Sequence, residues 1–356
     1  MTGETSFCLV MIVRNEGNVI RRCLESVRSL ISYWAISDTG SSDGTKQIIR
    51  DTLRGVPGEL HDDRWINFGH NRTINIERAR GKADYLLLMN ADEILNVNGS
   101  IPELRADAYL LRYEGDFDYH AQLLVRGDRE WHYVGATHEH IDSETPCHRE
   151  KLPALTITHF RDGGMRADKY ERDIDLLEKE VAAKPDNSRA VFYLAQSYRD
   201  IGNLARAMEL YERRTTMEGW EEETWCAAYQ VARMRHLLGM AWPLVLDAYL
   251  AAYSYRPTRL EPLYHIAKYH RLNNEPALTY LYSRPVVDTP YPDDLLFIER
   301  NTYEYLLPFE YALSCAAIGK HNEAARISAQ LLVHPSLPTD LRETLKFASQ
   351  TVGPDS

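Results

Sequence analysis

The chain has 356 residues, 44% of them hydrophobic, and a formal net charge of −11 at pH 7. This length is enough for about two domains, and the hydrophobic fraction excludes an intrinsically disordered chain. The acidic balance argues against tight nonspecific binding to nucleic acid or to an anionic membrane.

The N-terminal part is predicted to alternate strands and helices. The apolar runs at residues 7–13 and 85–89 are typical of strands buried on both faces of a sheet, and a shorter run covers residues 33–36. Apolar residues at helical spacing predict helices at residues 19–30 and 46–53. This order predicts an α/β, Rossmann-like nucleotide-binding fold.

The turn after the second strand is the most informative segment. Aspartate, glycine and serine crowd residues 37–45, where Gly40 and Gly44 permit backbone angles that other residues resist. Open α/β sheets bind nucleotides at such turns, beyond the carboxyl ends of their strands. Taken alone, the segment is also compatible with an ordinary tight loop.

The second half of the chain is predicted to be helical. From about residue 186 alanine, leucine and tyrosine recur at helical spacing, and residues 191–211 follow the tetratricopeptide pattern. Residues 312–324 repeat that spacing, with Gly319 at the turn, as Gly202 is in the first copy. We expect an all-α, TPR-like domain of about four helix pairs, whose aromatic residues serve packing.

The cysteines and the hydropathy indicate the compartment. The sequence contains no C-x-x-C pair. It also contains no apolar run of the ~20 residues that cross a bilayer, and no charged-then-apolar leader is evident. We therefore expect free thiols in a cytoplasmic protein with no membrane span. The five cysteines are Cys8, Cys23, Cys147, Cys226 and Cys315.

Four motifs over roughly residues 5–160 resemble the family-2 glycosyltransferases, which have the GT-A fold. In chain order they are Asn15-Glu16, the D-x-G-S-x-D-G-T turn at residues 38–45, Asn71-Arg72 with Ala-Arg-Gly at residues 79–81, and Asn90-Ala91-Asp92. The last stands where the family has D-x-D, so Asn90 is an amide in place of the first acid. The expected organisation is a GT-A domain over residues 1–165, a linking helix over 166–185 and the TPR-like domain over 186–356.

The resemblance implies an inverting, metal-dependent transfer of sugar from a nucleotide-sugar donor. A UDP-sugar is chosen on family base rates, and Mn²⁺ or Mg²⁺ is the implied cofactor, because a divalent cation offsets the charge of the diphosphate. The implied metal ligands are Asp92 and His159. The implied nucleotide-binding residues are Val13, Arg14, Asn15, Glu16, Asp38, Asp43, Arg72, Asn90 and Ala91. Alternatives remain for three of these: Asp43 as a helix cap, and Arg14 and Arg72 as solvated surface arginines.

Residues 131–140 resemble the Y-x-G-x-x-H-E element of family-2 enzymes that carry helical repeats. Glu139 is the implied general base, which takes a proton from the acceptor, and His138 would orient it or touch phosphate. Asp116 and Asp118 are reserve bases. On the linking helix, three further residues could close over the phosphates, namely Lys169, Tyr170 and Arg172.

The acceptor and two other protein classes stay open. The acceptor could be a glycan, a peptide or a modified DNA base, and the repeats favour a polymeric one because solenoids present extended surfaces. A nucleotidyltransferase is disfavoured, because the first strand lacks a glycine-rich, lysine-bearing loop. A catalytically inactive adaptor that binds a protein through its repeats is supported by Asn90 alone. The sequence leaves the sugar and the oligomeric state open.

Overall fold

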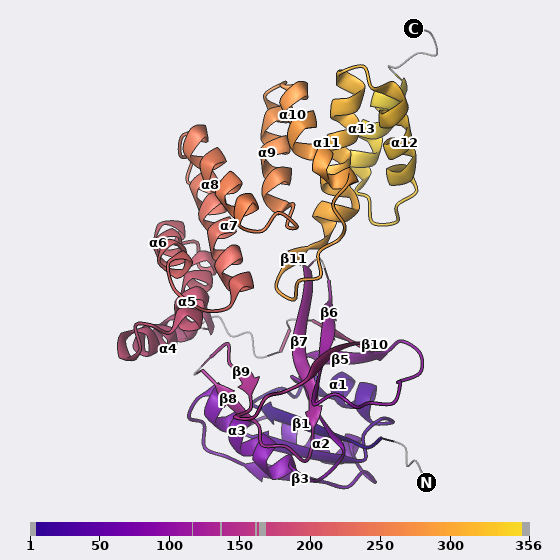
Figure 1. The fold of residues 1–356 in the computed structure, drawn as a ribbon. Coiled ribbons are helices and arrows are strands. Elements are labelled where there is room, and N and C mark those ends of the chain that lie inside the picture. Colours follow the sequence, from indigo (N-terminus) through magenta and orange to yellow (C-terminus); the bar gives the residue numbers. More distant parts are fainter. Residues whose placement is uncertain (1–4, 116, 136, 161, 164–168, 351–356) are drawn as a thin grey trace. The chain divides into compact units, whose positions relative to one another are not determined.

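The computed structural model describes residues 5–115, 117–135, 137–160, 162–163 and 169–350 (Figure 1). Its contacts divide the chain into two compact units: Met1–Gly115 with Tyr119–Ile201, and Asp116–Asp118 with Gly202–Ser356. Compactness is a different criterion from a domain boundary, so the boundaries expected at residues 165 and 185 remain a prediction.

The first unit is built on a mixed sheet, in which four neighbouring strands are parallel and the others extend it. The order is β3-β2-β1-β4-β7-β6-β10-β5. The strands are β1 (Phe7–Val13), β2 (Tyr33–Asp38), β3 (Gly58–Asp62), β4 (Tyr85–Leu88), β5 (Glu93–Val97), β6 (Ala108–Glu114), β7 (Phe117–Arg126) and β10 (Arg149–His159). Strand β7 runs antiparallel to both β4 and β6. The predicted α/β fold is confirmed.

Hydrophobic cores cover both faces of this sheet. On β1, Leu9 and Met11 face a core shared with α1 (Ile20–Val27) and α2 (Thr45–Thr52). The alternate residues Cys8 and Val10 face a core that includes Ile76 of α3 (Phe68–Ala79). The period of two in a strand produces this division, and it confirms that the apolar run is a strand buried on both faces.

A second, two-stranded sheet lies against α3. It pairs β8 (His132–Val134) with β9 (His140–Asp142). A Cβ atom built on Gly69 of α3 would lie 2.2 Å from the carbonyl oxygen of Gly135, so only glycine permits this close approach. The unit is completed by α4 (Lys169–Ala183) and α5 (Ser188–Asp200).

The second unit is helical, and successive helices pack against one another (Figure 1). Gly202 and Gly319, both predicted at turns, have φ angles of 81° and 82°. The helices are α6 (Leu204–Thr215), α7 (Glu221–Leu237), α8 (Trp242–Tyr255), α9 (Glu261–Leu272), α10 (Pro276–Ser283), η1 (Arg284–Val287), η2 (Thr302–Leu306), α11 (Leu307–Ala317), α12 (His321–Leu332) and α13 (Thr339–Gln350). The short strand β11 (Ile298–Glu299) pairs with residues 117–118, which group with this unit. The predicted helical-repeat architecture is confirmed.

No helix in the part of the chain that the structure describes combines the length and the apolar character needed to span a bilayer.

Candidate active site

The loops after β1 and β2 are joined by hydrogen bonds at the carboxyl edge of the sheet. The Asn15 backbone N–H donates to Ser41 Oγ at 2.8 Å, and Asn15 Oδ1 accepts from the Ser42 backbone N–H at 2.8 Å. The Glu16 backbone N–H donates to Thr45 Oγ1, also at 2.8 Å. Asn15 has a φ of 55°, which asparagine tolerates better than most residues. The two predicted motifs therefore form one interlocked structure.

Asp43 helps to hold these loops together. Its Oδ1 accepts from the Thr45 backbone N–H and its Oδ2 from the Gly17 backbone N–H, both at 3.0 Å. Burial acts to raise the pKa of this carboxyl, but the hydrogen bonds from Thr45 and Gly17 lower it overall. Both carboxylate oxygens are thus engaged at the start of α2, which favours the capping interpretation of Asp43 over a contact to nucleotide.

Asp38, the last residue of β2, is fully buried but only half satisfied. Its Oδ1 accepts from the backbone N–H groups of Gly40 and Ser41 at 2.9 and 2.7 Å, and Lys46 Nζ lies 3.8 Å from the same oxygen. Its Oδ2 is buried and has no hydrogen-bond partner among the described residues. Because an unpartnered buried carboxylate oxygen is unfavourable, this atom is suited to accept from a ligand N–H.

Asn90 follows β4, and both ends of its side chain are engaged. Its backbone N–H and its Nδ2 each donate to the Glu93 carboxylate at 2.7 Å, and its Oδ1 accepts from an Arg72 terminal nitrogen at 2.6 Å. Glu93 is fully buried and also accepts from the Tyr113 hydroxyl at 2.9 Å. The amide that departs from the family pattern is therefore part of a buried network.

Asp92 and His159 lie together although they are distant in the sequence. Asp92 Oδ2 is 3.0 Å from His159 Nε2 and 3.4 Å from the Gly163 backbone nitrogen. A Cβ atom at position 163 would lie 2.7 Å from Asp92 Cβ, so glycine is needed there. Burial acts to raise the pKa of Asp92, but the hydrogen bond and charge of His159 lower it overall.

The pair fits the donor set of a divalent cation. Carboxylate oxygen suits both Mn²⁺ and Mg²⁺, imidazole nitrogen suits transition-metal ions such as Mn²⁺ better than Mg²⁺, and both ions commonly complete their coordination with phosphate oxygens and water. In the described part of the chain no cluster of three or more histidine, cysteine, aspartate or glutamate side chains could hold a metal ion by itself. A cation at Asp92 and His159 would therefore depend on its substrate for further ligands.

Arg72 and Glu139 form an ion pair, in which Arg72 Nε lies 2.6 Å from Glu139 Oε1. The Nε–H bond is not aligned for a hydrogen bond to any described residue, so this contact depends on proximity. The side chains are only 15% and 11% exposed, which rules out a solvated surface arginine. Burial acts to lower the pKa of Arg72, but Glu139 raises it overall, so Arg72 stays charged.

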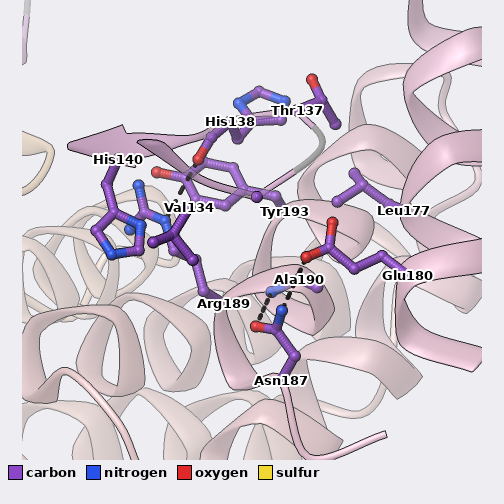
Figure 2. Close-up of a pocket in the computed structure, with 11 residues that line it drawn as sticks. Val134, Thr137, His138, His140, Leu177, Glu180, Asn187, Arg189, Ala190 and Tyr193 are labelled. Atoms are coloured by element: carbon purple, nitrogen blue, oxygen red, sulfur yellow. Dashed lines mark hydrogen bonds between the residues drawn. The ribbon is translucent and has the colours of Figure 1, made fainter. Parts of the chain in front are cut away.

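His138 lines a pocket in the first unit together with residues of α4 and α5 (Figure 2). Its ring stacks on that of Tyr193 at 4.3 Å, and its carbonyl oxygen accepts from Arg189 Nε at 3.3 Å. The pocket has a volume of about 50 Å³. Glu139 is the next residue in the chain but does not line this pocket, and its carboxylate contacts Arg72 instead.

The structure describes the side chains of some of the remaining candidate residues but not of others. Val13 and Ala91 are buried, Arg14 is exposed, and Glu16 is partly buried. Arg172 lies 3.6 Å from Asp173 and over the Phe68 ring. Asp116 lies outside the described residues, and the side chains of Asp118, Lys169 and Tyr170 are not described.

Two members of the site carried no motif signal of their own. Tyr113 is an ordinary strand residue until β6 brings its hydroxyl to Glu93. Asn75 is buried on α3, where its Nδ2 donates to the carbonyl oxygens of Met11 and Ala35 and fixes the helix to β1 and β2. A polar residue at a buried helical position was the only available indication of Asn75.

Comparison with known proteins shows which family the first unit resembles. Residues 8–169 match the model of the family described as "Glycosyl transferase family 2". A TPR repeat-containing protein of Synechococcus elongatus is 29% identical over 48% of this chain and 43% of its own length. The SPbeta prophage-derived glycosyltransferase SunS of Bacillus subtilis is 22% identical over 52% of this chain and 47% of its own length. The chain thus spans less than half the length of these curated relatives.

Among solved structures, S. aureus TarS (residues 1–349) is 12% identical over 82% of this chain and 98% of its own, with a TM-score of 0.34. A likeness at that level carries no argument about function. The family match includes every candidate residue that the sequence motifs indicated, from Val13 to His159. Residues 8–169 of this chain therefore form a domain of glycosyl transferase family 2.

Proposed function

We propose that the protein is an inverting glycosyltransferase that uses a UDP-sugar and a divalent cation. The observation that carries the proposal is the combination of three features in the first unit: an unsatisfied buried carboxylate at the end of β2, an Asp–His pair whose aspartate follows β4, and an Arg–Glu pair whose arginine contacts Asn90, which also follows β4. These are the functions that a sugar nucleotide requires: base recognition, charge neutralisation at the diphosphate, and proton removal from the acceptor.

Asp38 supports uracil as the base. Its Oδ1 is already occupied by two backbone N–H groups, so only Oδ2 remains for a ligand. The imide of uracil offers a single N–H donor, whereas guanine presents two adjacent donors that match a carboxylate with both oxygens free. A single available oxygen therefore favours UDP over GDP.

Asp92 and His159 would hold the cation, which when bound supplies positive charge opposite the leaving diphosphate. Arg72 keeps its charge at the same edge of the sheet and adds to that field. Glu139 takes the proton as an acceptor oxygen or nitrogen attacks the anomeric carbon, while the bond from that carbon to the diphosphate breaks. One displacement of this kind inverts the configuration.

The inactive-adaptor alternative gains no support from a specific observation. Asn90 was its only argument, and the contacts of Asn90 with Glu93 and Arg72 give that residue a different explanation.

The proposal is tested by sugar-nucleotide hydrolysis and thermal shift with purified protein, using UDP- and GDP-sugars with Mn²⁺ or with chelator. We expect a UDP-sugar with Mn²⁺ to raise the melting temperature and to be turned over. Asp92→Ala should abolish turnover and the Mn²⁺-dependent part of UDP binding. Its control is Asp51→Ala, because Asp51 is an exposed acid on α2 that pairs with Arg54. Full activity of the Asp92 variant in chelator would refute the metal site.

A further inference from the structure

A continuous chain of polar contacts runs from β6 to the predicted base. The Tyr113 hydroxyl donates to Glu93 at 2.9 Å, and Glu93 accepts from Asn90 Nδ2 at 2.7 Å. Asn90 Oδ1 accepts from Arg72 at 2.6 Å, and Arg72 Nε lies 2.6 Å from Glu139. All five residues belong to the first unit.

The direction of the contacts fixes how the Asn90 amide is oriented. Glu93 is fully buried and takes three hydrogen bonds as an acceptor, from the Asn90 backbone, Asn90 Nδ2 and Tyr113. Because a guanidinium can only donate, the carbonyl oxygen of Asn90 must face Arg72, and its NH₂ group therefore faces Glu93. Arg72 thus meets a neutral acceptor on one side and a carboxylate, Glu139, on the other.

An acid at position 90 would change both neighbours. A carboxylate there could not donate to Glu93, and two buried like charges would oppose each other at hydrogen-bond distance. It would also face Arg72 with a charged acceptor, and charge-assisted contacts are roughly twice as strong as neutral ones. Arg72 would then be drawn from Glu139 toward position 90.

We propose that Asn90 and Glu93 are positioning residues for Glu139. Glu93 orients the Asn90 amide, and the amide holds Arg72 through a neutral contact. Glu139 is then the only carboxylate in this chain of contacts that the Arg72 guanidinium meets directly. This inference rests on the proposed role of Glu139 as the base. It assigns a function to the residue by which the chain departs from D-x-D.

Three variants separate this role from a merely structural one. In Asn90→Asp the new carboxylate opposes Glu93 and competes for Arg72, so we expect a lower melting temperature and a kcat of transfer at least tenfold lower. In Asn90→Asp/Glu93→Gln the glutamine amide can donate to the carboxylate at position 90, so the melting temperature should recover. The kcat should stay low, because Arg72 still faces a carboxylate there. Because Asn90 is also an implied nucleotide-binding residue, kcat is measured at saturating donor, so that a change in donor KM does not enter the comparison.

A cycle with Glu139→Gln distinguishes failure of this inference from failure of the proposed function. If Asn90 acts through Glu139, Asn90→Asp should cost little further kcat once Glu139→Gln is present. An equal loss in both backgrounds would overturn the positioning role and leave Glu139 as the base. Wild-type turnover of Glu139→Gln alone would overturn the base assignment, and the positioning role with it.

Two other results would also overturn the inference. If kcat recovers together with the melting temperature in Asn90→Asp/Glu93→Gln, the pair is only structural. If Asn90→Asp raises both turnover and Mn²⁺-dependent UDP affinity in a thermal-shift titration, an acid at this position serves the metal site better than the amide serves Arg72.

Discussion

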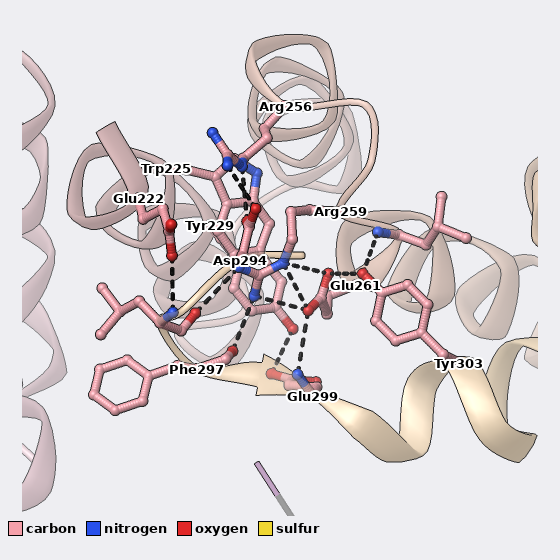
Figure 3. A network of polar contacts seen from close by, with 12 residues as sticks. Glu222, Trp225, Tyr229, Arg256, Arg259, Glu261, Asp294, Phe297, Glu299 and Tyr303 are labelled. Carbon is pink, nitrogen blue, oxygen red and sulfur yellow. Dashed lines mark hydrogen bonds and ion pairs between the residues drawn. The ribbon is translucent and has the colours of Figure 1, made fainter. Parts of the chain in front are cut away.

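Two arginines with little solvent exposure, one in each unit, have opposite surroundings. Arg259 in the second unit is fully buried, and all three of its guanidinium nitrogens donate to fixed acceptors (Figure 3). The acceptors are the carboxylates of Glu261 and Asp294 and the carbonyl oxygens of Leu296 and Phe297. The guanidinium also lies 3.8 Å from the centre of the Trp225 ring.

Arg72 in the first unit is held more loosely. Among the described residues it contacts one neutral acceptor, Asn90, the Tyr133 side chain, and one carboxylate, Glu139, to which its Nε–H is not aligned. Nearby, Asp38 keeps a buried oxygen without a partner among the described residues. We call a network closed when its buried polar atoms all have protein partners, and open when some of them remain available to a ligand. A closed network stabilises the fold, whereas an open network can bind a ligand. This difference distinguishes the two units more clearly than their charge does.

The closed network also explains why an irregular segment is ordered. Glu222 of α7 accepts from the backbone N–H groups of Leu295 and Leu296, both at 2.8 Å. Glu261 accepts from the Glu299 backbone N–H at 3.2 Å and from the Tyr303 hydroxyl at 2.8 Å. Buried side chains of α7 and α9 thus satisfy backbone groups that regular secondary structure would otherwise satisfy.

The largest effect is expected from opening the closed network. Arg259→Met leaves the buried Glu261 without its cation and removes one partner of Asp294, so unfolding of the second unit should become easier by about 3–5 kcal/mol. Urea denaturation followed by tryptophan fluorescence measures this, because Trp225 lies beside Arg259. The control is Arg284→Met, which breaks an exposed pair with Asp288 and should cost far less stability, because solvent screens that pair. Equal losses in the two variants would refute the structural role.

A smaller free-energy change, expressed in rate and not in stability, is expected at the open network. Glu139→Gln keeps the shape of the side chain but cannot take a proton, so transfer should fall about a hundredfold or more, which corresponds to about 2.7 kcal/mol. Donor affinity should stay near that of the wild type. Initial rates at saturating donor, with isothermal titration of UDP as the control, check this expectation. Undiminished kcat would move the base elsewhere.

Asp38→Asn should weaken UDP binding without weakening the fold. The amide oxygen can keep the hydrogen bonds from Gly40 and Ser41, which places an NH₂ donor where Oδ2 now lies. A donor cannot accept from uracil, so the Kd for UDP should rise about tenfold or more. The melting temperature should change little, because the hydrogen bonds to Oδ1 are kept and Oδ2 has no partner to lose. A marked decrease in melting temperature would mean that Asp38 stabilises the fold, as the network around Arg259 does, and does not serve a ligand.

The smallest effect is a pH dependence in the second unit. Burial, with Arg233, His236 and Lys268 nearby, lowers the pKa of His265 to about 3, and its Nε2 lies 2.8 Å from the Tyr229 hydroxyl. In the unfolded chain His265 is protonated below about pH 6.5, whereas in the folded protein it stays neutral down to about pH 3. The free energy of unfolding therefore keeps its full contribution from His265 above pH 6.5 and loses it as the pH decreases toward 3.

Because the His265 ring keeps partial contact with solvent, we expect a loss of about 1 kcal/mol between pH 7 and pH 5 from this residue. Urea midpoints of the wild type and of His265→Gln, measured at both pH values, isolate that contribution. If the two proteins lose the same stability on acidification, His265 does not titrate as described.

The elements, and the grouping of the motif residues at one edge of the sheet, could be predicted because their signals are local. An apolar run such as residues 7–13 can bury both faces only inside a sheet, and the turn at residues 38–45 needs glycine at position 40, where φ is 107°. The expectation for Gly44 was wrong, because its φ of −75° is open to other residues. Parallel strands then bring their carboxyl ends to one edge, so the motifs after β1, β2 and β4 had to be neighbours. The spacing of small and large residues likewise determined a helical repeat.

The tertiary structure decided which side chains became partners. Asp92 meets His159, 67 residues away, because β10 pairs with β5 and its last residue lies opposite Glu93. Arg72 meets Glu139 because Gly69 lets the loop at Gly135 approach α3. Local pattern reports burial and backbone angle, but a hydrogen bond depends on tenths of an ångström set by elements distant in the chain. For that reason Asn90 looked like a lost acid in the sequence, and its engagement with Glu93 and Arg72 emerged only from the fold.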